Sequence, residues 1–438
     1  KHIIDRLSLD DLLELSKKHK ELKIGTYCND DDISIAYYFY SRTSTFPDLN
    51  GASNDDELQD FLLRREFRGQ TFDNKTGKCI CRPFHKFFSV GEMNESKPER
   101  VNQVLKRVLS GDLNCWLLEK LDGSMCFAMN YKGNVVIRTK MGHTSDVAKE
   151  AHKLVQNEPK VESMIHDSLK KGYTPIFEYF SPNHKVVINY KSKAFLSLLA
   201  LRHLQTGEYL PYHTLQEIAK KFDISIVRQW SVASLKKGEW INDATADEGK
   251  KIASTFTCEQ LVKRVETIEG IEGFVLRFSD GQAFKMKTNW YNAAHDAKHK
   301  LTFSSHFNES RVWSLIFDER VDDVLPTLVE EDKEALKAFQ DLIFLKLSKT
   351  VERAVKDLST LQPTSIKDLA MRLKTTTYDA LYQRFLFEMY KTKSQDDEAS
   401  FHLLRSMLHP KLGGKLATVK KVLQANEMNF TFPSKQQK

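Results

Sequence analysis

Glu119-Lys120-Leu121-Asp122-Gly123-Ser124 is the stretch on which the interpretation of this chain depends. The apolar run before it, residues 116–119, predicts a strand that delivers Lys120 to its end. Gly123 permits a sharp turn directly beyond the lysine. A lysine is a covalent nucleophile only as the neutral amine, and an ordinary lysine pKa is about 10.4. We therefore expect burial or cationic neighbours to favour the neutral form, with a plain surface Lys-x-Asp-Gly turn as the alternative.

Two carboxylates follow in predicted strands. Glu178 lies between Phe177 and Tyr179, and strand alternation turns it away from both rings. It is either an acceptor for a ribose hydroxyl or an exposed carboxylate at a strand edge. Glu272 opens a predicted hairpin over 273–278 and 282–287. Here a carboxylate suits a hydrated metal ion or a phosphate-bound water, although a lone glutamate at this place is more often a turn residue.

A lysine pair lies in the second strand of that hairpin. Lys285 and Lys287 share one face, because side chains alternate with a period of two along a strand. Two like charges on one face repel each other unless an anion lies between them. The pair therefore indicates a phosphate site more strongly than a solvated strand face.

Composition excludes several other classes of protein. The 438 residues are 41% hydrophobic, which suffices for a buried core in two or three domains. Six cysteines without a C-x-x-C pair exclude a disulfide scaffold or a zinc ribbon, and Cys79 and Cys81 are expected as buried thiols. Neither an apolar run long enough to cross a membrane nor a signal peptide is evident, so we expect a cytoplasmic protein, in the host cytoplasm if it is viral.

The charge balance indicates a polyanionic partner only weakly. The net charge is +7 at pH 7. Between residues 400 and 438, basic residues stand against the single acid Glu427. This tail is either a surface for a phosphate backbone or a solvated helix face.

The pattern along the chain predicts an α+β protein with a boundary near residue 295. Residues 1–25 are expected as one amphipathic helix, and residues 27–82 as short strands with turns, such as 50–55. Further strands are predicted over 116–119, 125–129, 135–140, 175–180, 185–190 and 194–201, and helices over 145–155, 215–222 and 259–267. Beyond 295 the spacing is helical over 333–347, 351–358, 366–373 and 378–390.

Taken together, these motifs resemble the covalent nucleotidyltransferase superfamily of ligases and capping enzymes, and most closely the phage-type RNA ligase 1 family of T-even phages. The resemblance covers roughly residues 25–295. The stretches that distinguish this family are Arg68-Gly69, Arg82-Pro83-Phe84-His85-Lys86-Phe87-Phe88, the run from Phe177 to Val187, and Phe284-Lys285-Met286-Lys287-Thr288-Asn289-Trp290-Tyr291. One departure is His184-Lys185, where Asn-Arg is usual.

The resemblance implies a mixed, antiparallel-sheet nucleotidyltransferase domain of the ATP-grasp-like ligase kind over residues 1–295. An all-α domain over 296–438 would supply RNA or tRNA specificity. It further implies an ATP-dependent RNA ligase that joins 5′-phosphate and 3′-hydroxyl ends through a lysyl-AMP intermediate, with Mg²⁺ or Mn²⁺. The expected partners are RNA ends, above all a tRNA with a broken anticodon loop, and a separate end-healing kinase and phosphatase. We expect no membrane partner and a monomer.

Site residues are carried over from the family by matching position. Lys120 would be the nucleophile, and Lys285 and Lys287 would hold the α-phosphate. Glu272 and Asp122 would position the metal, although Asp122 equally suits a role in stabilising the turn. The remaining nucleotide-binding positions are Arg68, Lys86 and Tyr291 toward the β- and γ-phosphates, Lys140 as an essential lysine, Phe88 at the floor, Gly123 in the nucleophile turn and Glu178 at the ribose.

Three rival interpretations stay open. A DNA ligase usually has Arg at the position of Ser124, and a capping guanylyltransferase usually has Thr at that of Leu121. Both carry a β-barrel after the last lysine pair, where this chain shows helical spacing. A non-catalytic RNA-binding relative is the third, and the retention of all the charged positions argues against it.

Overall fold

The computed structural model describes residues 2–27, 30–39, 41, 44–140, 145–181, 188, 194–293, 309–325, 328–392, 397–412 and 414–433. The chain forms two compact units. The first comprises Lys1–Phe39 and Thr45–Thr302, and the second comprises Tyr40–Ser44 and Phe303–Lys438. The expected functional boundary near residue 295 falls among residues outside the described ranges and stays a prediction.

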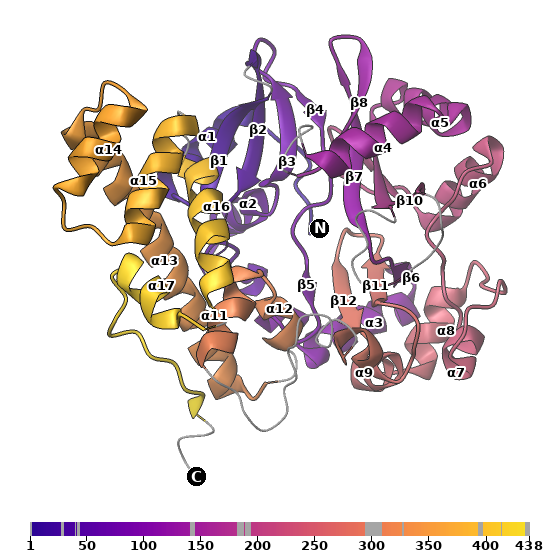
Figure 1. Cartoon of the computed structure of the whole chain (residues 1–438). Coiled ribbons are helices and arrows are strands. Elements are labelled where there is room, and N and C mark those ends of the chain that lie inside the picture. The colour runs from indigo at the N-terminus through magenta and orange to yellow at the C-terminus, as the bar shows by residue number, and fades with distance from the viewer. Residues whose placement is uncertain are drawn as a thin grey trace. The chain divides into compact units, whose positions relative to one another are not determined.

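In the described residues, the first unit contains three four-stranded sheets (Figure 1). The N-terminal sheet has the order β1-β2-β3-β4, with the strands Leu22–Tyr27, Asp30–Tyr38, Arg68–Asp73 and Cys79–Cys81. The middle sheet has the order β10-β9-β7-β8, with the strands Phe195–His203, Tyr173–Phe180, Ser124–Tyr131 and Asn134–Arg138. The lysine sheet has the order β5-β12-β11-β6, with the strands Phe88–Ser89, Ala283–Lys287, Gly273–Phe278 and Cys115–Lys120. Its β5–β12 pair is parallel, and the other pairs named here are antiparallel.

Hydrophobic packing joins these sheets to helices. The N-terminal and middle sheets share a buried cluster that includes Ile35, Cys81, Phe127 and Ile176. Helix α1 (Leu9–Lys18) packs against the N-terminal sheet, and helix α2 (Asp55–Arg64) packs against α1. Helices α4 (Asp146–Gln156), α5 (Pro159–Lys170) and α6 (Tyr212–Phe222) contact the middle sheet, and α3 (Pro98–Ser110), α7 (Val232–Lys237), α8 (Glu248–Thr255) and α9 (Cys258–Glu266) pack around the lysine sheet. Strand β6 contributes Trp116 and Leu118 to the core of the middle sheet and Leu117 to that of the lysine sheet, so the turn between β6 and β7 connects two sheets that pack on opposite faces of this strand.

Local sequence signals account for most elements of this unit. The side chain of Ser145 accepts a hydrogen bond from the Ala148 amide and caps α4, as predicted. The predicted strands and hairpin around Lys120, Glu178 and Lys285 are confirmed, whereas the strand expected over 185–190 lies mostly outside the described residues. Cys79 and Cys81 are free thiols, and Cys81 is fully buried.

Two predictions near the N-terminus are only partly confirmed. The helix expected over 1–25 is confined to Leu9–Lys18, because Ser8 caps its start and residues 22–27 pair with β2 instead. The stretch 50–55, expected as a turn, leads into α2. Asn54 caps this helix by accepting from the Glu57 amide, and three acidic residues occupy its first turn. Turn-forming residues here serve as a helix cap.

Every described residue of the second unit that has regular secondary structure is helical, which confirms the predicted all-α region. Its helices are α11 (Glu309–Phe317), α12 (Val321–Val324), α13 (Glu330–Leu361), α14 (Ile366–Lys374), α15 (Ala380–Thr392), α16 (Asp397–Leu408) and α17 (Leu416–Val422), besides a short 3₁₀ turn. The two helices expected over 333–347 and 351–358 are one helix, because no Gly or Pro interrupts α13. Among the described residues, no helix is long and apolar enough to span a membrane.

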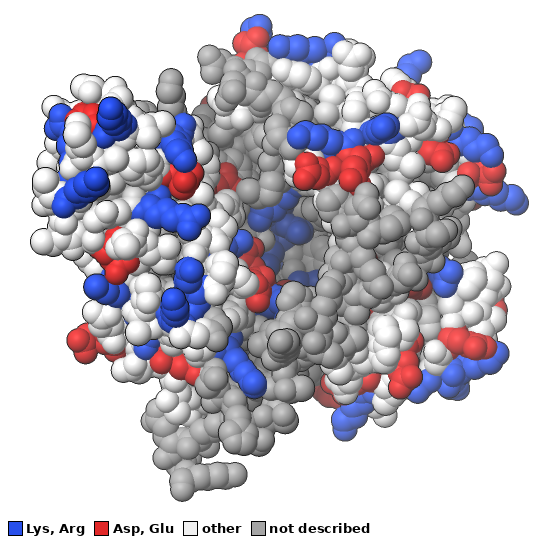
Figure 2. Space-filling model, in the orientation of Figure 1, with Lys and Arg blue, Asp and Glu red and all other residues white. Residues whose placement is uncertain are grey.

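Three of the five described cations of the basic tail pair with acids of their own unit, whereas Lys435 and Lys438 lie outside the described residues. The paired cations are Arg405 with Glu319, Lys420 with Glu309 at 2.8 Å and Lys421 with Asp379 at 3.4 Å. Figure 2 shows basic and acidic side chains interspersed over these helices, which Figure 1 draws in orange and yellow. This arrangement favours the solvated helix face over a dedicated phosphate surface.

Candidate functional site

Two lysines from different strands meet on one carboxylate in the lysine sheet. Lys120 Nζ lies 2.5 Å from Glu272 Oε1, and Lys287 Nζ lies 3.4 Å from the same oxygen. Both nitrogens are therefore within the roughly 4–6 Å over which charges influence each other's protonation. The structure thus brings together three of the residues that the sequence indicated, from segments 152 positions apart.

Strand register explains this meeting. Gly273 of β11 is paired with Lys120 of β6 on one side and with Lys287 of β12 on the other. A Cβ atom at Gly273 would collide with the carbonyl oxygen of Met286 and lie 2.8 Å from the Lys287 Cα. Only glycine fits between the two lysines. The adjacent Glu272, at the start of β11, is then carried to their ammonium groups.

Lys120, Glu272 and Lys287, here called the lysine trio, do not form the purely cationic surrounding that the sequence led us to expect. The Glu272 side chain is only 4% exposed, whereas those of Lys120 and Lys287 keep 24% and 18% of their surface. A carboxylate in direct contact stabilises the ammonium form of a lysine. Glu272 occupies the position of an anion between two cations. The expected neutral nucleophile therefore stays a prediction, and it requires this carboxylate to be engaged elsewhere.

The turn after the nucleophile strand is packed tightly against β9. The Gly123 amide donates to Glu178 Oε1 at 3.1 Å. A Cβ atom at Gly123 would lie 2.5 Å from the Tyr179 carbonyl oxygen and 3.1 Å from the Phe180 ring. Backbone atoms of β9 cannot move away without disturbing the hydrogen bonds to the strands on both sides. The turn thus needs glycine for space as well as for its bend.

Replacing Gly123 with alanine should therefore damage both stability and activity. We expect a loss of about 2 kcal/mol in the free energy of unfolding, in the range of overpacked interiors, because the turn must lift away from β9. The matched control is Gly51→Ala, where no atom lies within 4 Å of the added Cβ. Urea unfolding of both variants checks this, and equal stabilities would contradict the packing argument.

Burial sets the protonation of Glu178. Desolvation raises the pKa of Glu178 to about 8, against the opposing effect of Lys120 and with a further increase from Glu272. Phe177 and Tyr179 on either side are both buried in the core of the middle sheet, so neither is placed to stack on a base. Glu178 thus points from β9 toward the Gly123 turn and suits hydrogen bonding to a hydroxyl.

The raised pKa of Glu178 predicts a pH dependence of stability. Between about pH 5 and pH 8 the folded chain keeps a proton that the unfolded chain has released, so stability falls as pH rises. A Glu178→Gln variant lacks this effect. Relative to wild type, the free energy of unfolding of this variant should increase by about 2 kcal/mol over that range. The full pKa difference would give a larger increase, but the Glu178 side chain is partly exposed and solvent weakens the effect. Chemical denaturation across pH measures it, with Glu217→Gln as control, and parallel curves for wild type and the Glu178→Gln variant would contradict it.

Asp122 is held by two donors on the other side of the turn. The Tyr291 hydroxyl donates to Asp122 Oδ1 at 2.8 Å, and the Ile188 amide donates to Oδ2 at 2.7 Å. Tyr291 is buried, and the Lys287 ammonium lies 5.4 Å from its ring centre. Asp122 and Tyr291 thereby stabilise the turn, and Tyr291 also packs beside Lys287. The expected contacts of Asp122 with metal and of Tyr291 with phosphates stay predictions.

The remaining expected cations gather on a separate aromatic cluster. Lys140 lies 3.8 Å from the ring centre of Tyr38, and Lys86 lies 5.3 Å from that of Phe88. Phe46 links the two rings, at 5.1 Å from Tyr38 and 6.4 Å from Phe88. Neither Tyr38 nor Phe46 stands out in the sequence, since a single aromatic residue usually indicates only core packing.

Arg68 lies at the same side, beside this cluster. Its Nη1 donates to the His85 carbonyl at 3.0 Å, and its buried Nε has no hydrogen-bond partner among the described residues. The position of a Cβ at neighbouring Gly69 would be 3.6 Å from the Lys140 Cα, so these two motifs adjoin. Phe88 lies in β5, three strand spacings from β6, or roughly 14 Å. Strand β5 is also the direct neighbour of β12, so the Phe88 end of the cluster adjoins the strand that carries Lys285 and Lys287.

His85 is not placed for proton transfer at this site. Its ring contacts the Tyr209 hydroxyl at 2.8 Å, and burial, followed by Arg202, lowers the pKa of His85 well below its usual range. Close by, Glu66 forms ion pairs with Arg82 and Arg202, all three fully buried. Burial opposes ionisation of Glu66, but the two arginines hold its pKa well below the usual range. This network stabilises the fold.

To bind a metal ion, the site needs ligands from a substrate in addition to its own side chains. Among the described residues, no group of three or more His, Cys, Asp or Glu side chains is arranged to hold a metal ion. Glu272 is the carboxylate in direct contact with Lys120 and Lys287. Mg²⁺ is commonly bound by one or two carboxylates together with substrate phosphates. The residues fit a divalent ion that arrives with a polyphosphate, and they do not form a metal cage of their own.

Comparisons with known proteins agree with these motifs. A family model described as RNA ligase matches residues 66–291, more than half of the chain. A protein of Thermovibrio ammonificans named "Putative RNA ligase" is 30% identical over 349 residues, which cover 77% of this chain and 78% of that protein. RNA ligase 1 of Bacteriophage TS2126 is 24% identical over 288 residues, 65% of this chain and 61% of the phage protein.

Solved structures give a weaker likeness. An archaeal ATP-dependent RNA ligase matches 79% of this chain and 80% of its own at 11% identity, and its TM-score of 0.42 is too low to carry an argument. The assignment rests on the family match and on the bacterial relative. The chain therefore belongs to the RNA ligase 1 family and is an RNA ligase.

Proposed function

We propose that this RNA ligase joins 5′-phosphate and 3′-hydroxyl RNA ends through a lysyl-AMP intermediate on Lys120, with ATP and Mg²⁺ or Mn²⁺. The observation that carries the proposal is the carboxylate of Glu272 shared by Lys120 and Lys287. A nucleophile, a phosphate-binding cation and a candidate metal ligand meet at one point. A chance surface lysine has no reason to be paired in register with a second lysine across a glycine.

The first step is attack by the Lys120 nitrogen on the α-phosphorus of ATP. A phosphorus–nitrogen bond forms, the bond to the β-phosphate oxygen breaks, and pyrophosphate leaves. Lys287, and Lys285 on the same strand face, neutralise charge on the α-phosphate. Glu178 accepts a ribose hydroxyl, and Gly123 lets the backbone approach the nucleotide. Release of Lys120 from Glu272 is what makes its amine available.

The divalent ion would supply charge neutralisation on the phosphates and compete with Lys120 for the Glu272 carboxylate. Glu272 would hold it together with phosphate oxygens, and Asp122 would remain with Tyr291 as the support of the turn. Arg68, Lys86 and Lys140 on the aromatic cluster would take the β- and γ-phosphates. Phe88 forms part of the floor beneath Lys86.

Two further transfers complete the reaction. An oxygen of the RNA 5′-phosphate attacks the lysyl-AMP phosphorus, so that the phosphorus–nitrogen bond breaks and Lys120 regains its amine. The 3′-hydroxyl oxygen of the other end then attacks the activated 5′-phosphate, loses its proton and releases AMP. Both steps use Lys285 and Lys287 as before, because negative charge again accumulates around one phosphorus.

Incubation of the wild-type protein with each of four α-labelled nucleoside triphosphates and Mg²⁺ tests the proposal. We expect acid-labile label on the protein from ATP alone, and its transfer to a 5′-phosphorylated RNA. Omission of the metal should prevent labelling, because Glu272 then keeps Lys120 paired. Equal labelling by another nucleotide, or none by ATP, would refute the proposal.

The physiological substrate in this proposal is a tRNA with a broken anticodon loop. Residues 1–295 would carry the chemistry, and the helical residues 296–438 would contribute recognition of the folded RNA. A separate kinase and phosphatase would prepare the ends, since only a 5′-phosphate and a 3′-hydroxyl can react. Ligation rates of a nicked tRNA and of a linear single strand, compared at equal concentration, measure this preference, and a faster linear reaction would overturn it.

A further inference from the structure

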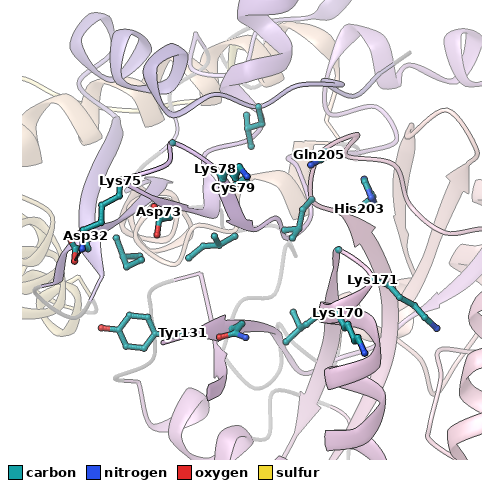
Figure 3. Close-up of a pocket in the computed structure, with 18 of the residues that line it drawn as sticks. Asp32, Asp73, Lys75, Lys78, Cys79, Tyr131, Lys170, Lys171, His203 and Gln205 are labelled. Atoms are coloured by element: carbon teal, nitrogen blue, oxygen red, sulfur yellow. Dashed lines mark hydrogen bonds and ion pairs between the residues drawn. The ribbon is translucent and has the colours of Figure 1, made fainter. Parts of the chain in front are cut away.

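A concave surface of the first unit lies apart from the lysine trio. It is a groove of about 1510 Å³, which exceeds the usual size of a small-molecule pocket. Figure 3 shows Lys75, Lys78 and Cys79 on one side and Tyr131, Lys170 and Lys171 on the facing side. These residues come from β3 and β4 with their turn, from the β7–β8 turn and from the end of α5.

The lining of this basic groove is strongly positive. Six Lys or Arg residues line it against two aspartates, Asp32 and Asp73. Lys75 pairs with Asp32 at 2.7 Å, and Asp73 is held by hydrogen bonds from Thr76. Both acids are thus already engaged. Of the other cations, Lys171 pairs with Asp167 at 2.7 Å. The excess charge comes from Arg6, Lys78, Lys132 and Lys170.

Two of these lysines are available for an anion. Lys78 and Lys170 are exposed, and no carboxylate lies within ion-pair distance of either in the described residues. They come from the β3–β4 turn and from the last turn of α5. Like charges held on two walls of one groove repel each other unless a polyanion lies between them.

An aromatic side chain accompanies the charges. Tyr131 lines the groove, and its ring packs edge-on against the buried Tyr27 at 5.1 Å. Lys132 Nζ lies 5.2 Å from the centre of the Tyr131 ring. Aromatic rings beside a track of cations are typical of surfaces that bind single-stranded nucleic acid, where bases stack and phosphates pair.

The middle sheet connects this groove to the lysine trio. Strand β7 is eight residues long, begins at Ser124 next to the Gly123 turn and ends at Tyr131 in the groove. At about 3.3 Å per residue the two sites are roughly 25 Å apart. That distance corresponds to about seven nucleotides of a stacked strand. Strand β9 runs between the same two regions, from Tyr173 beside Gly172 to Phe180.

We propose that the basic groove binds a single-stranded segment of the RNA substrate about seven nucleotides or more from the end that is being joined. The inference rests on the proposed function, since it takes RNA as the substrate. It adds a binding surface within the first unit itself. Long strands would gain affinity from the groove, whereas short ones would reach only the lysine trio.

The test compares two double charge reversals with equal change in net charge. Lys78→Glu with Lys170→Glu alters the groove, and Lys106→Glu with Lys250→Glu alters exposed lysines on α3 and α8. Fluorescence anisotropy measures the affinity of each protein for single-stranded RNAs of about five and about twenty nucleotides at several salt concentrations. Protein–AMP formation from ATP without RNA is measured in parallel.

We expect the groove variant to bind the long RNA at least about tenfold more weakly, with a salt slope smaller by about 1.4 for two lost phosphate contacts. Its affinity for the short RNA and its labelling by ATP should match wild type. The proposal that the groove binds RNA would be refuted by any of three results. These are an unchanged affinity for the long RNA, an equal loss of affinity for both RNA lengths, and an equal loss of affinity in the control variant. Absence of labelling in wild type would instead refute the lysyl-AMP chemistry.

Discussion

Replacing Lys120 with alanine should reduce protein–AMP formation below detection and abolish RNA joining. The amine is the only protein atom that bonds to the nucleotide in the proposed mechanism, so no neighbouring cation can replace it. Glu272 keeps Lys287 as a partner in this variant. We therefore expect the free energy of unfolding to change by no more than about 2 kcal/mol. Gel autoradiography with labelled ATP measures the adduct.

Lys120→Arg separates nucleophilicity from charge. A guanidinium keeps the ion pair with Glu272 but cannot lose its proton under these conditions. It should fold like wild type and remain unlabelled. A variant with arginine or alanine at this position that still accepts AMP at the wild-type rate would exclude Lys120 as the nucleophile, even if the protein proved to be a ligase.

Lys287→Ala should slow protein–AMP formation by about 10²–10³-fold at saturating ATP. This is the usual cost of removing one preorganised charge that stabilises a transition state. Lys287 and the nucleophile Lys120 share one oxygen of Glu272. Single-turnover labelling separates this rate from ATP affinity. The affinity should weaken much less, because the ground-state phosphates keep Lys285 and the metal.

Lys285→Ala and Lys250→Ala complete that series. Lys285 shares the strand face of Lys287 but lies further along β12 from Lys120, opposite Val275. We expect a smaller loss at Lys285 and none at Lys250, an exposed lysine on α8. A normal labelling rate in the Lys287 variant would show that the hairpin cations do not hold the α-phosphate.

Several features of the site follow from local sequence alone. Strand alternation placed Glu178 opposite its buried aromatic neighbours and put Lys285 and Lys287 on one face, as the exposed and buried positions of β9 and β12 confirm. The hairpin and the glycine turn after Lys120 are equally local, because their signals lie within a few residues. Prediction was incomplete where polar residues have two uses: the turn over 50–54 is present, but its Asn54 also caps the helix α2, which the pattern did not reveal.

Pairings between distant segments could not be derived in this way. The contact of Lys120 with Glu272 joins residues 152 positions apart, and that of Asp122 with Tyr291 joins residues 169 apart. Their geometry depends on which strands become neighbours in the lysine sheet. The engagement of tail cations by Glu309 and Asp379, and the gathering of Lys78 and Lys170 on one groove, depend on packing in the same way.

Consecutive residues are enough to specify the nucleophile strand, the lysine hairpin and the helical C-terminal region, because alternation, turns and helical spacing are local patterns. The motifs also identified the RNA ligase 1 family. The position of Glu272 between two lysines and the support of Asp122 by Tyr291 emerge only in the folded chain. Strand register across Gly273 sets those distances, and register is a property of the assembled sheet.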